Sequence, residues 1–209
     1  MKGPTAIVTL VALLTAAGVW SAAATAAPAA QRYVIQPGDS SVSYRVNETL
    51  FNQGNRVATA VGTTTAVRGE ITVDRARPAN SRIGTVTVDI SQFKSDSQRR
   101  DDRIRQSWLE SAKFPNAEFT ATEIKGLPDA YQDGREVPVQ ITGNLKIRDV
   151  TRPTTWASTI KLDGNTLTIT GNTTIKMTDF GFDPPSIFGI LKTENEARLE
   201  FRFVARAGT

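Results

Sequence analysis

The stretch SDSQRRDDRIRQSWLESAKFP, residues 95–115, gathers side chains that could do chemistry. Asp101 and Asp102 are adjacent carboxylates, and carboxylates serve many enzymes as general acids and bases. Adjacent residues on a helix point about 100° apart, so these two carboxylates do not converge on one bond. The arginines around them suit ion pairing rather than proton transfer. We therefore expect structural ion pairs here, including one between Asp101 and Arg105.

Three arginines, Arg99, Arg100 and Arg103, supply positive charge to the same stretch. One interpretation is contact with an anion, such as the pyrophosphate of a lipid head group. The other is a solvated helix face whose aliphatic stems cover neighbouring apolar surface. The residue types alone leave both interpretations open.

The composition removes several classes of active site. The 209-residue chain contains no histidine and no cysteine. This excludes a Ser-His-Asp triad, an HExxH zinc site, a thiolate metal site and a cysteine nucleophile. An enzyme built from this sequence would need carboxylate or lysine chemistry, or a metal held by oxygen ligands. No convergent acidic cluster is evident, so we expect no enzyme, no catalytic residue, no metal and no cofactor.

The elements that position these side chains are mostly strands. Apolar and polar residues alternate after Gln31, and a period of two is typical of antiparallel strands with one buried face. Turn-forming residues separate the runs, and Asp163-Gly164-Asn165 predicts a hairpin. We expect one domain of about eight antiparallel strands, and the pattern does not choose between a sandwich and a closed barrel. The alternating apolar sets are Val42, Tyr44 and Val46; Val86, Val88 and Ile90; Val137, Val139, Ile141, Leu145 and Ile147; Leu167, Ile169 and Ile175; and Leu199, Phe201 and Phe203.

The charged stretch is the exception and predicts one short helix between strands. Ser95 and Gln98 have the spacing of a capping box, with Ser95 as the N-cap. Ile104 and Trp108 are four residues apart and would share the inward face. The segment ends at Pro115, because the residue before a proline disfavours helix.

Two groups of apolar side chains are candidates for a ligand cavity. Trp108 and Trp156 would either line a cavity or belong to an ordinary core. Residues 179–191, DFGFDPPSIFGIL, form an apolar segment interrupted by two prolines, which cannot lie inside a central strand. This segment is either a portal flap over a cavity or the cover of a sheet end, and we favour the portal.

The first 26 residues have the features of an export signal. Met1-Lys2 gives a positive start, Ala6 to Trp20 is an apolar run, and Ala24-Thr25-Ala26 matches a small-residue cleavage pattern. The apolar run is short for a membrane span. We expect cleavage near Ala26, a folded domain over 27–209 and a periplasmic or extracellular location without stable membrane insertion. The alternative is a signal that is kept as an anchor.

The net charge of +4 reflects 25 Lys and Arg against 21 Asp and Glu. Outside residues 95–115 both signs are interspersed, as on an ordinary solvated surface. Nucleic-acid binders usually gather basic side chains into a stripe beside a reading motif. Because the sequence has neither feature, we expect no nucleic-acid partner.

Several stretches follow one another in a specific order between Tyr33 and about Val204. They are YVIQPGDSSVSYRV, VGTTTAVRGEI, SRIGTVTVDISQFKSDSQRRDDRIRQSWLESAKFPNAEF, ITGNLKIRDVTRPTTWAST and MTDFGFDPPSIFGIL with ARLEFRFVAR. The most specific element is the SD-x-x-RRD helix and KFP-x-A-x-F, followed by G-N-L-x-I-x-D-V-T-R-P. In this order the chain resembles the YceI-like family of lipocalin-like, polyisoprenoid-binding proteins.

The resemblance implies a mainly β fold, an extended antiparallel eight-stranded barrel with a lipocalin-like interior. It also implies export and an isoprenoid-type lipid as partner. Arg99, Arg100 and Arg103 are the candidates for head-group contact. The candidate cavity or portal residues are Trp108, Phe114, Phe119, Trp156, Phe180, Phe182, Ile187 and Phe188.

The leading hypothesis is therefore a secreted or periplasmic protein that sequesters a long apolar lipid, of isoprenoid quinone or polyprenyl type. One alternative is a structural or stress-response interaction protein whose barrel is filled by side chains. A second alternative is an enzyme that works without histidine or cysteine. The sequence specifies neither the lipid nor the oligomeric state.

Overall fold

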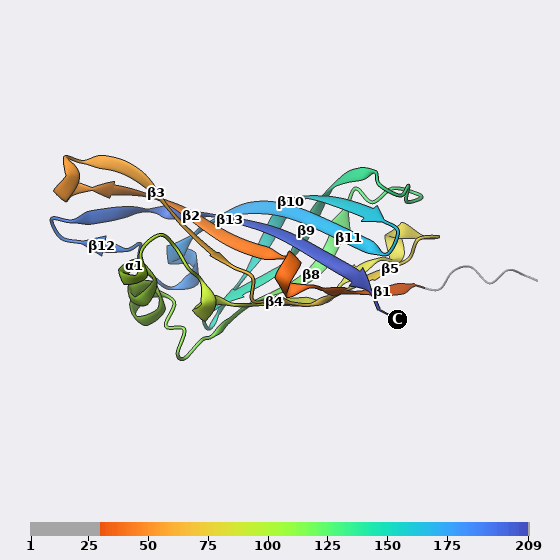
Figure 1. Ribbon diagram of the computed structural model, residues 1–209, viewed down its shortest axis with the longest axis horizontal. Helices are drawn as coiled ribbons and strands as arrows, with labels where there is room; N and C mark the ends of the chain where they lie inside the picture. The colour runs from red at the N-terminus through yellow and green to blue at the C-terminus, as the bar shows by residue number, and fades with distance from the viewer. Residues whose placement is uncertain (1–29, 209) are drawn as a thin grey trace, which may run out of the picture.

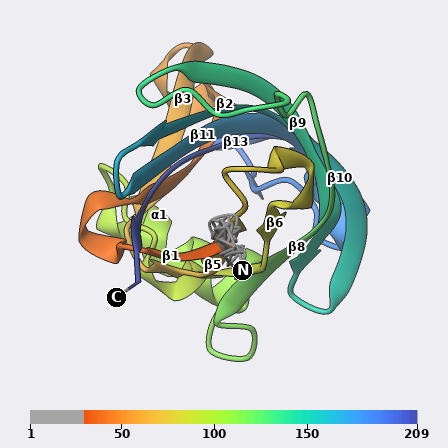
Figure 2. The same ribbon diagram turned by 90° about the vertical axis from the view of Figure 1, so that its right-hand side faces the viewer.

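The computed structural model describes residues 30–208, which form a single antiparallel sheet of 13 strands. The sheet is strongly curled, and the end view in Figure 2 shows its strands arranged as a ring. The strands are β1 (Gln31–Ile35), β2 (Ser41–Leu50), β3 (Arg56–Thr64), β4 (Val67–Arg68), β5 (Glu70–Val73), β6 (Arg82–Ile83), β7 (Thr85–Asp89), β8 (Asn116–Lys125), β9 (Glu136–Ile147), β10 (Val150–Asp163), β11 (Thr166–Lys176), β12 (Ser186–Ile187) and β13 (Leu191–Ala207).

Helical structure is limited to short segments. The only α-helix in the described part of the chain is α1 (Gln98–Arg103), which continues into a π-helical turn, η5 (Ile104–Trp108). The 3-10 turns are η1 (Pro37–Asp39), η2 (Phe51–Gln53), η3 (Pro78–Asn80), η4 (Ile90–Gln92) and η6 (Met177–Phe180). No helix within residues 30–208 has the length and apolarity needed to cross a bilayer.

The strand order is β4-β7-β8-β9-β10-β11-β13-β1-β5-β6. The two ends of the sheet are joined by the chain itself. At one end β4 pairs with β7, at the other end β5 pairs with β1, and Gly69 alone separates β4 from β5. A Cβ atom at Gly69 would lie 3.2 Å from the Cα of Val86 and from a methyl of Ile35. Glycine therefore lets the chain pass closely between two strands where the curled sheet meets itself.

The expected fold is confirmed, although the strands number 13 rather than eight. The difference comes from short strands, since β4, β6 and β12 have two residues each and β5 has four. Bends and turns separate these pieces from the long strands that the alternating pattern reveals. At the other extreme, β13 has 17 residues and pairs with β11 on one side and with β1 and β2 on the other.

The alternating apolar residues face the interior as predicted. On β11, Leu167 and Ile169 are each 2% exposed, and the predicted hairpin at Gly164 is present with a φ of 55°. The same holds on β9 and β13, where the alternating residues belong to the apolar core or pack against it. Burial of one face of every long strand is the main stabilising contribution that the sequence pattern encodes.

The helix is present, but two details of its prediction are wrong. Its N-cap is Ser97, whose side chain accepts from the Arg100 backbone N–H, and not Ser95. Asp101 forms no ion pair with Arg105, because Asp101 is buried and its carboxylate accepts from the Ser95 backbone N–H at 3.0 Å. Asp101 thereby organises the loop before the helix.

The proposed export signal, residues 1–26, lies outside the described residues.

Candidate functional site

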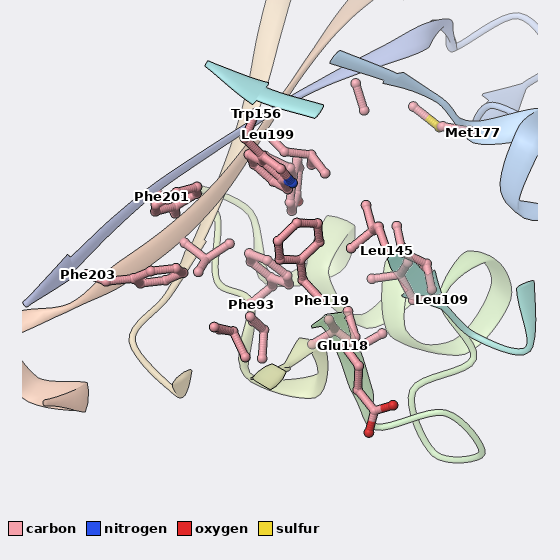
Figure 3. A pocket seen from close by; sticks show the side chains of 18 of the residues that line it. Phe93, Leu109, Glu118, Phe119, Leu145, Trp156, Met177, Leu199, Phe201 and Phe203 are labelled. Carbon is pink, nitrogen blue, oxygen red and sulfur yellow. The ribbon is translucent and has the colours of Figure 1, made fainter. Parts of the chain in front are cut away.

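A cavity of about 180 Å³ lies inside the curled sheet and is bounded almost entirely by carbon atoms. Figure 3 shows aromatic and aliphatic side chains converging on it from several strands. The lining residues are Val42, Tyr44, Ile71, Ile83, Val86, Val88, Ile90, Phe93, Ile104, Trp108, Leu109, Ala117, Glu118, Phe119, Ile141, Leu145, Ile147, Trp156, Ile169, Met177, Phe182, Pro185, Ala197, Leu199, Phe201 and Phe203.

Aromatic rings form a connected cluster along the cavity wall. The Trp156 ring meets Phe119 edge to face at 5.9 Å and Phe201 at 5.2 Å between centroids, and Phe201 stacks on Phe203 at 4.3 Å. These separations are in the range where aromatic pairs attract beyond simple burial. The aromatic part of the wall is therefore a closely packed apolar surface (Figure 3).

Strand glycines make room for these rings. Gly62 on β3 lies opposite Tyr44 on β2, and a Cβ at Gly62 would lie 2.3 Å from the Tyr44 ring. Gly171 on β11 lies opposite Phe201 on β13, and a Cβ there would lie 2.6 Å from the Phe201 ring. Each aromatic ring thus occupies the space that a cross-strand side chain would fill.

Few polar atoms face the cavity. Glu118 lines it only with its aliphatic stem, since its carboxylate points away in Figure 3 and lies 3.8 Å from the Lys146 ammonium. The indole Nε1 of Trp156 is buried without a hydrogen-bond partner among the described residues. Desolvation, reinforced by the negative charge of Asp101, raises the pKa of the Tyr44 hydroxyl to about 12. The cavity therefore offers neutral, apolar chemistry at physiological pH.

The helical segment closes part of the cavity wall. Ile104, Trp108 and Leu109 all line the cavity, which confirms that Ile104 and Trp108 share an inward face. The π-helical turn sets this geometry, with the Leu109 N–H donating to the Ile104 carbonyl at 2.8 Å. Arg148, in the turn between β9 and β10, fixes the end of the segment by donating to the Glu110 carboxylate at 2.8 Å.

Four of the eight predicted ligand residues line the cavity: Trp108, Phe119, Trp156 and Phe182. The structure brings them together from η5, β8, β10 and the segment after η6. Trp156 is 6% exposed, so the two alternatives for it, core and cavity wall, are both realised. Their contact with a ligand stays a prediction.

The other four predicted residues lie away from the cavity lining. Phe114 packs beneath two cations, Lys113 at 4.7 Å and Arg148 at 5.7 Å from its ring centroid. Phe180 is 2% exposed and belongs to the solid core. Ile187 lies in β12, and Phe188 is fully exposed in the turn that follows. These positions place one apolar segment, 179–191, partly in the core, partly on the cavity wall and partly in solvent.

The three candidate head-group arginines have different surroundings. Arg100 donates to Glu48 at 3.0 Å and also pairs with Asp96, so its guanidinium is engaged within the protein. Arg99 and Arg103 make no ion pair with any residue from 30 to 208. Head-group contact therefore stays a prediction for Arg99 and Arg103, while the role that the geometry gives Arg100 is structural.

The sequence interpretation named only part of the cavity wall. Tyr44, Leu199, Phe201 and Phe203 line the cavity, and the period-two pattern already placed them on inward faces. That pattern could have identified them as wall residues, because the inward face of a barrel bounds whatever space it encloses. Phe93 lies outside any alternating run, and its ring meets that of Tyr44 at 5.2 Å only in the folded chain.

No group of three or more acidic side chains that could hold a metal is found over residues 30–208. Asp101 and Asp102 do not act on a common point: the Asp101 carboxylate is bound by Ser95, and Asp102 accepts from Arg105 at 3.0 Å. The concentrated charge of residues 95–115 is therefore used to fix the helical segment against the sheet.

Solved structures with the same fold were found by comparison of coordinates. BcnA of Burkholderia cenocepacia matches with a TM-score of 0.62 and 21% identity, over 81% of this chain and 98% of BcnA. A polyisoprenoid binding domain from Saccharophagus degradans, implicated in plant cell wall breakdown, matches with a TM-score of 0.63 and 12% identity, over 84% of this chain and 98% of that domain. At these identities the matches establish the fold.

Sequence comparison finds curated relatives over a shorter stretch. A UPF0312 protein of Enterobacter sp. (strain 638) is 35% identical over 88 residues, which are 42% of this chain and 41% of the relative. A UPF0312 protein of Yersinia pestis (strain Pestoides F) is 33% identical over 98 residues, 46% of each chain. The matched stretch thus spans less than half the length of these relatives.

The model of the YceI-like domain matches residues 33–205, which include every strand from β2 to β12. The chain belongs to the YceI-like domain family.

Proposed function

We propose that this protein binds and sequesters a long apolar lipid, of isoprenoid quinone or polyprenyl type, in the cavity of its curled sheet. The observation that carries the proposal is the cavity itself, which is enclosed by strands and by the helical segment and lined by apolar and aromatic side chains. The fold shared with the polyisoprenoid binding domain from Saccharophagus degradans supports the same ligand class.

The energetics of such binding need no polar anchor. Each CH₂ group transferred from water to an apolar environment contributes about 0.8 kcal/mol. A prenyl chain carries many such groups, so micromolar or tighter affinity is reached even after the cost of ordering the chain. An apolar wall of fixed aromatic rings further lowers the ordering cost on the protein side.

The size of the cavity limits how a long chain is held. Its volume of about 180 Å³ is smaller than the roughly 300–1,000 Å³ of typical ligand pockets. We propose that only part of the lipid lies in this space at first, and that further chain enters as side chains of the wall change rotamer. Met177 lies at the wall, and its unbranched side chain can adopt other rotamers in this manner.

We also propose that the protein acts outside the cytoplasm, in the periplasm or beyond the cell. The support is the sequence of residues 1–26, with its positive start, apolar run and small-residue cleavage pattern. Release of the chain from residues 1–26 would leave the β domain free to meet lipids at a membrane surface. N-terminal sequencing of the protein purified from its host tests this part directly, with residue 27 as the expected first residue.

The structural alternative is a barrel filled by side chains, which would serve as an interaction protein. A cavity bounded by apolar atoms favours lipid binding over that alternative, because filled interiors leave few voids larger than a water molecule. An enzyme is the less favoured candidate, since the chain lacks histidine and cysteine.

The deciding experiment is mass spectrometry of lipid that co-purifies with the protein from its native host. We expect a polyprenol or an isoprenoid quinone, which the purified protein takes up again after extraction. Binding of shorter fatty acids without isoprenoids would show that the ligand class is wrong. Absence of any bound or rebound lipid would favour the structural alternative.

Cavity-filling variants locate the lipid. Ala197 on β13 and Ala117 on β8 both line the cavity, and replacing either by leucine should reduce lipid content several-fold. Overpacking costs about 1–3 kcal/mol of stability, so two sites are used and each variant is checked for folding. The matched control is Ala157→Leu, on the exposed face of β10 beside Trp156. Equal lipid content in all four proteins would exclude the cavity as the site.

A further inference from the structure

All strongly exposed large hydrophobic side chains of residues 30–208 lie in the end regions of two neighbouring hairpins. Phe51, Val57, Phe188 and Ile190 have exposed fractions of 43%, 73%, 103% and 38%. Soluble proteins rarely gather exposed apolar side chains unless the surface binds a partner or a membrane. We call residues 49–57 and 186–193 together the apolar tip.

The apolar tip is built by two hairpins that are bonded to each other. β2 and β3 form the first, β12 and β13 form the second, and Leu50 of the first pairs with Leu191 of the second. The Phe51 N–H donates to the Ile190 carbonyl at 2.8 Å, so the two turns are held side by side. Figure 1 shows both hairpins projecting beyond the rest of the sheet at one end of the molecule.

The charges of the apolar tip are all positive. Its two segments contain Arg56 and Lys192, both exposed, and no acidic residue. The ion pair between Arg100 and the buried Glu48 holds α1 at the same end. The helix brings Arg99 to this end, and also Asp102, whose carboxylate is paired with Arg105. Glu48 and Glu194 directly flank the two segments. Glu48 is 5% exposed and pairs with Arg100, and Glu194 accepts from the Asn47 side-chain amide at 3.0 Å.

The apolar tip is connected to the cavity wall. Phe182 and Pro185 line the cavity immediately before β12. Thr193, at the base of the second hairpin, donates to the Pro185 carbonyl at 2.9 Å through both its backbone N–H and its hydroxyl. A surface that binds the tip therefore lies close to the wall segment that contains Phe182.

We propose that the apolar tip docks on the surface of a membrane that contains anionic lipids. The four apolar side chains enter the boundary between head groups and acyl chains, and Arg56 and Lys192 contact anionic head groups. This inference goes beyond lipid sequestration, because docking uses exposed residues and needs no ligand in the cavity. Its consequence is that the cavity wall at Phe182 is presented to the bilayer.

The charge pattern favours a membrane over a second copy of the chain. Two copies meeting tip to tip would bring two positively charged surfaces together, because each tip contains Arg56 and Lys192 and no acidic residue. Like charges at an interface oppose association. An anionic lipid surface complements both features of the tip, its apolar side chains and its positive charge.

The test is binding of the protein to vesicles that contain no isoprenoid lipid. One set is phosphatidylcholine alone, and the other contains phosphatidylglycerol as the anionic lipid. We expect tighter binding to the anionic set. Phe188→Ser should weaken binding to that set roughly tenfold, and Lys192→Glu should weaken it roughly fivefold or more. Lys192→Glu should leave binding to phosphatidylcholine unchanged.

Two controls separate this inference from lipid sequestration. Arg135→Glu reverses an exposed charge in the loop between β8 and β9, at the opposite end of the molecule, and should leave vesicle binding unchanged. The cavity variant Ala197→Leu should lose bound lipid but keep vesicle binding. Phe188→Ser should bind vesicles more weakly but keep its lipid content when it is loaded in detergent solution. Equal vesicle affinity of wild type and Phe188→Ser overturns the inference. So does a dimer in vesicle-free sedimentation that Phe188→Ser dissociates.

Discussion

Asp101 and Asp102 are neighbours in the chain but have opposite roles. Asp101 is 4% exposed, and its carboxylate accepts from the backbone N–H and the hydroxyl of Ser95. Asp102 is half exposed and pairs with Arg105 at the surface. The same side-chain type thus serves as a buried loop acceptor at one position and as a weak surface ion pair at the next.

Replacing these two residues in turn should separate the roles. Asp101→Ala leaves the Ser95 donors without their acceptor, so the free energy of unfolding should fall by about 1–3 kcal/mol. Asp102→Ala removes an exposed ion pair and should cost less than about 1 kcal/mol. Urea unfolding of both variants measures the difference, and equal losses would contradict the assigned roles.

Tyr44 gives the stability a dependence on alkaline pH. Burial in the cavity wall, with a smaller contribution from Asp101, raises the pKa of its hydroxyl to about 12, from about 10 in an unfolded chain. Between these values the unfolded chain releases the proton while the folded chain keeps it. The contribution is fully present below pH 10 and is lost as pH rises through the folded pKa.

We therefore expect the wild type to lose about 2–3 kcal/mol of unfolding free energy between pH 10 and 12 from this residue. Tyr44→Phe should show a shallower decline over the same range. Burial also raises the pKa of Tyr131, so the variant keeps part of the slope. Chemical unfolding at several pH values measures both profiles; parallel curves would show that Tyr44 does not titrate as described.

At the scale of elements, the helical segment is fixed to the sheet by an ion pair whose carboxylate is buried. Glu48 on β2 is 5% exposed and accepts from Arg100 on α1 at 3.0 Å. Arg105 adds hydrogen bonds from its guanidinium to the carbonyls of Ser91 and Phe93. These polar contacts hold Ile104 and Trp108 in the cavity lining. The arginine side chains on the outside of the helical segment therefore fix the position of apolar side chains on its inside.

Arg100→Ala should detach this element. The change leaves Glu48 buried without a partner, which typically costs about 3–5 kcal/mol. The matched control is Arg99→Ala, an adjacent arginine on the same helix with no ion pair among residues 30–208, and it should cost less than about 0.5 kcal/mol. Thermal unfolding measures the loss of stability, and tryptophan fluorescence in a Trp156→Phe background reports the surroundings of Trp108. Similar melting temperatures would show that the pair does not anchor α1.

At the scale of the whole molecule, the curled sheet converts many separate inward faces into one cavity. A ligand that binds only the folded state stabilises it by an amount that grows with the ratio of ligand concentration to Kd. The cavity makes this coupling specific, because its wall combines residues from β2, β7, β8, β10 and β13 that meet only in the folded sheet.

Removing bound lipid should therefore lower the melting temperature. At a ligand concentration of 100 Kd we expect a decrease of roughly 5–10 °C on extraction, and its recovery on adding back polyprenol. Ala197→Leu should melt at the same temperature with and without polyprenol. Calorimetry of the extracted and reloaded protein measures this. A lipid-dependent shift of equal size in the variant would place the ligand elsewhere.

The prediction of strands and faces from sequence succeeded where local pattern is sufficient. Leu167 and Ile169 had to face inward together, because side chains two apart on a strand share a face. The N-cap was misplaced from Ser97 to Ser95 because both serines fit the local signal, and only the burial of Asp101 decides between them. The predicted ion pair between Asp101 and Arg105 is absent for the same reason, since the buried Asp101 carboxylate accepts from Ser95 instead.

The sequence by itself determined a β domain with one helix and inward faces rich in apolar residues, since period and composition are properties of neighbouring residues. It also excluded histidine and cysteine chemistry. Only the tertiary structure decided which inward residues line the cavity and which fill the core. Phe182 lines the cavity, whereas Phe180 is buried in the core. The same holds for the apolar tip, where Phe51 and Ile190 meet through strand pairing across 139 positions of the chain. Curl and long-range pairing set these distances, and no local pattern encodes them.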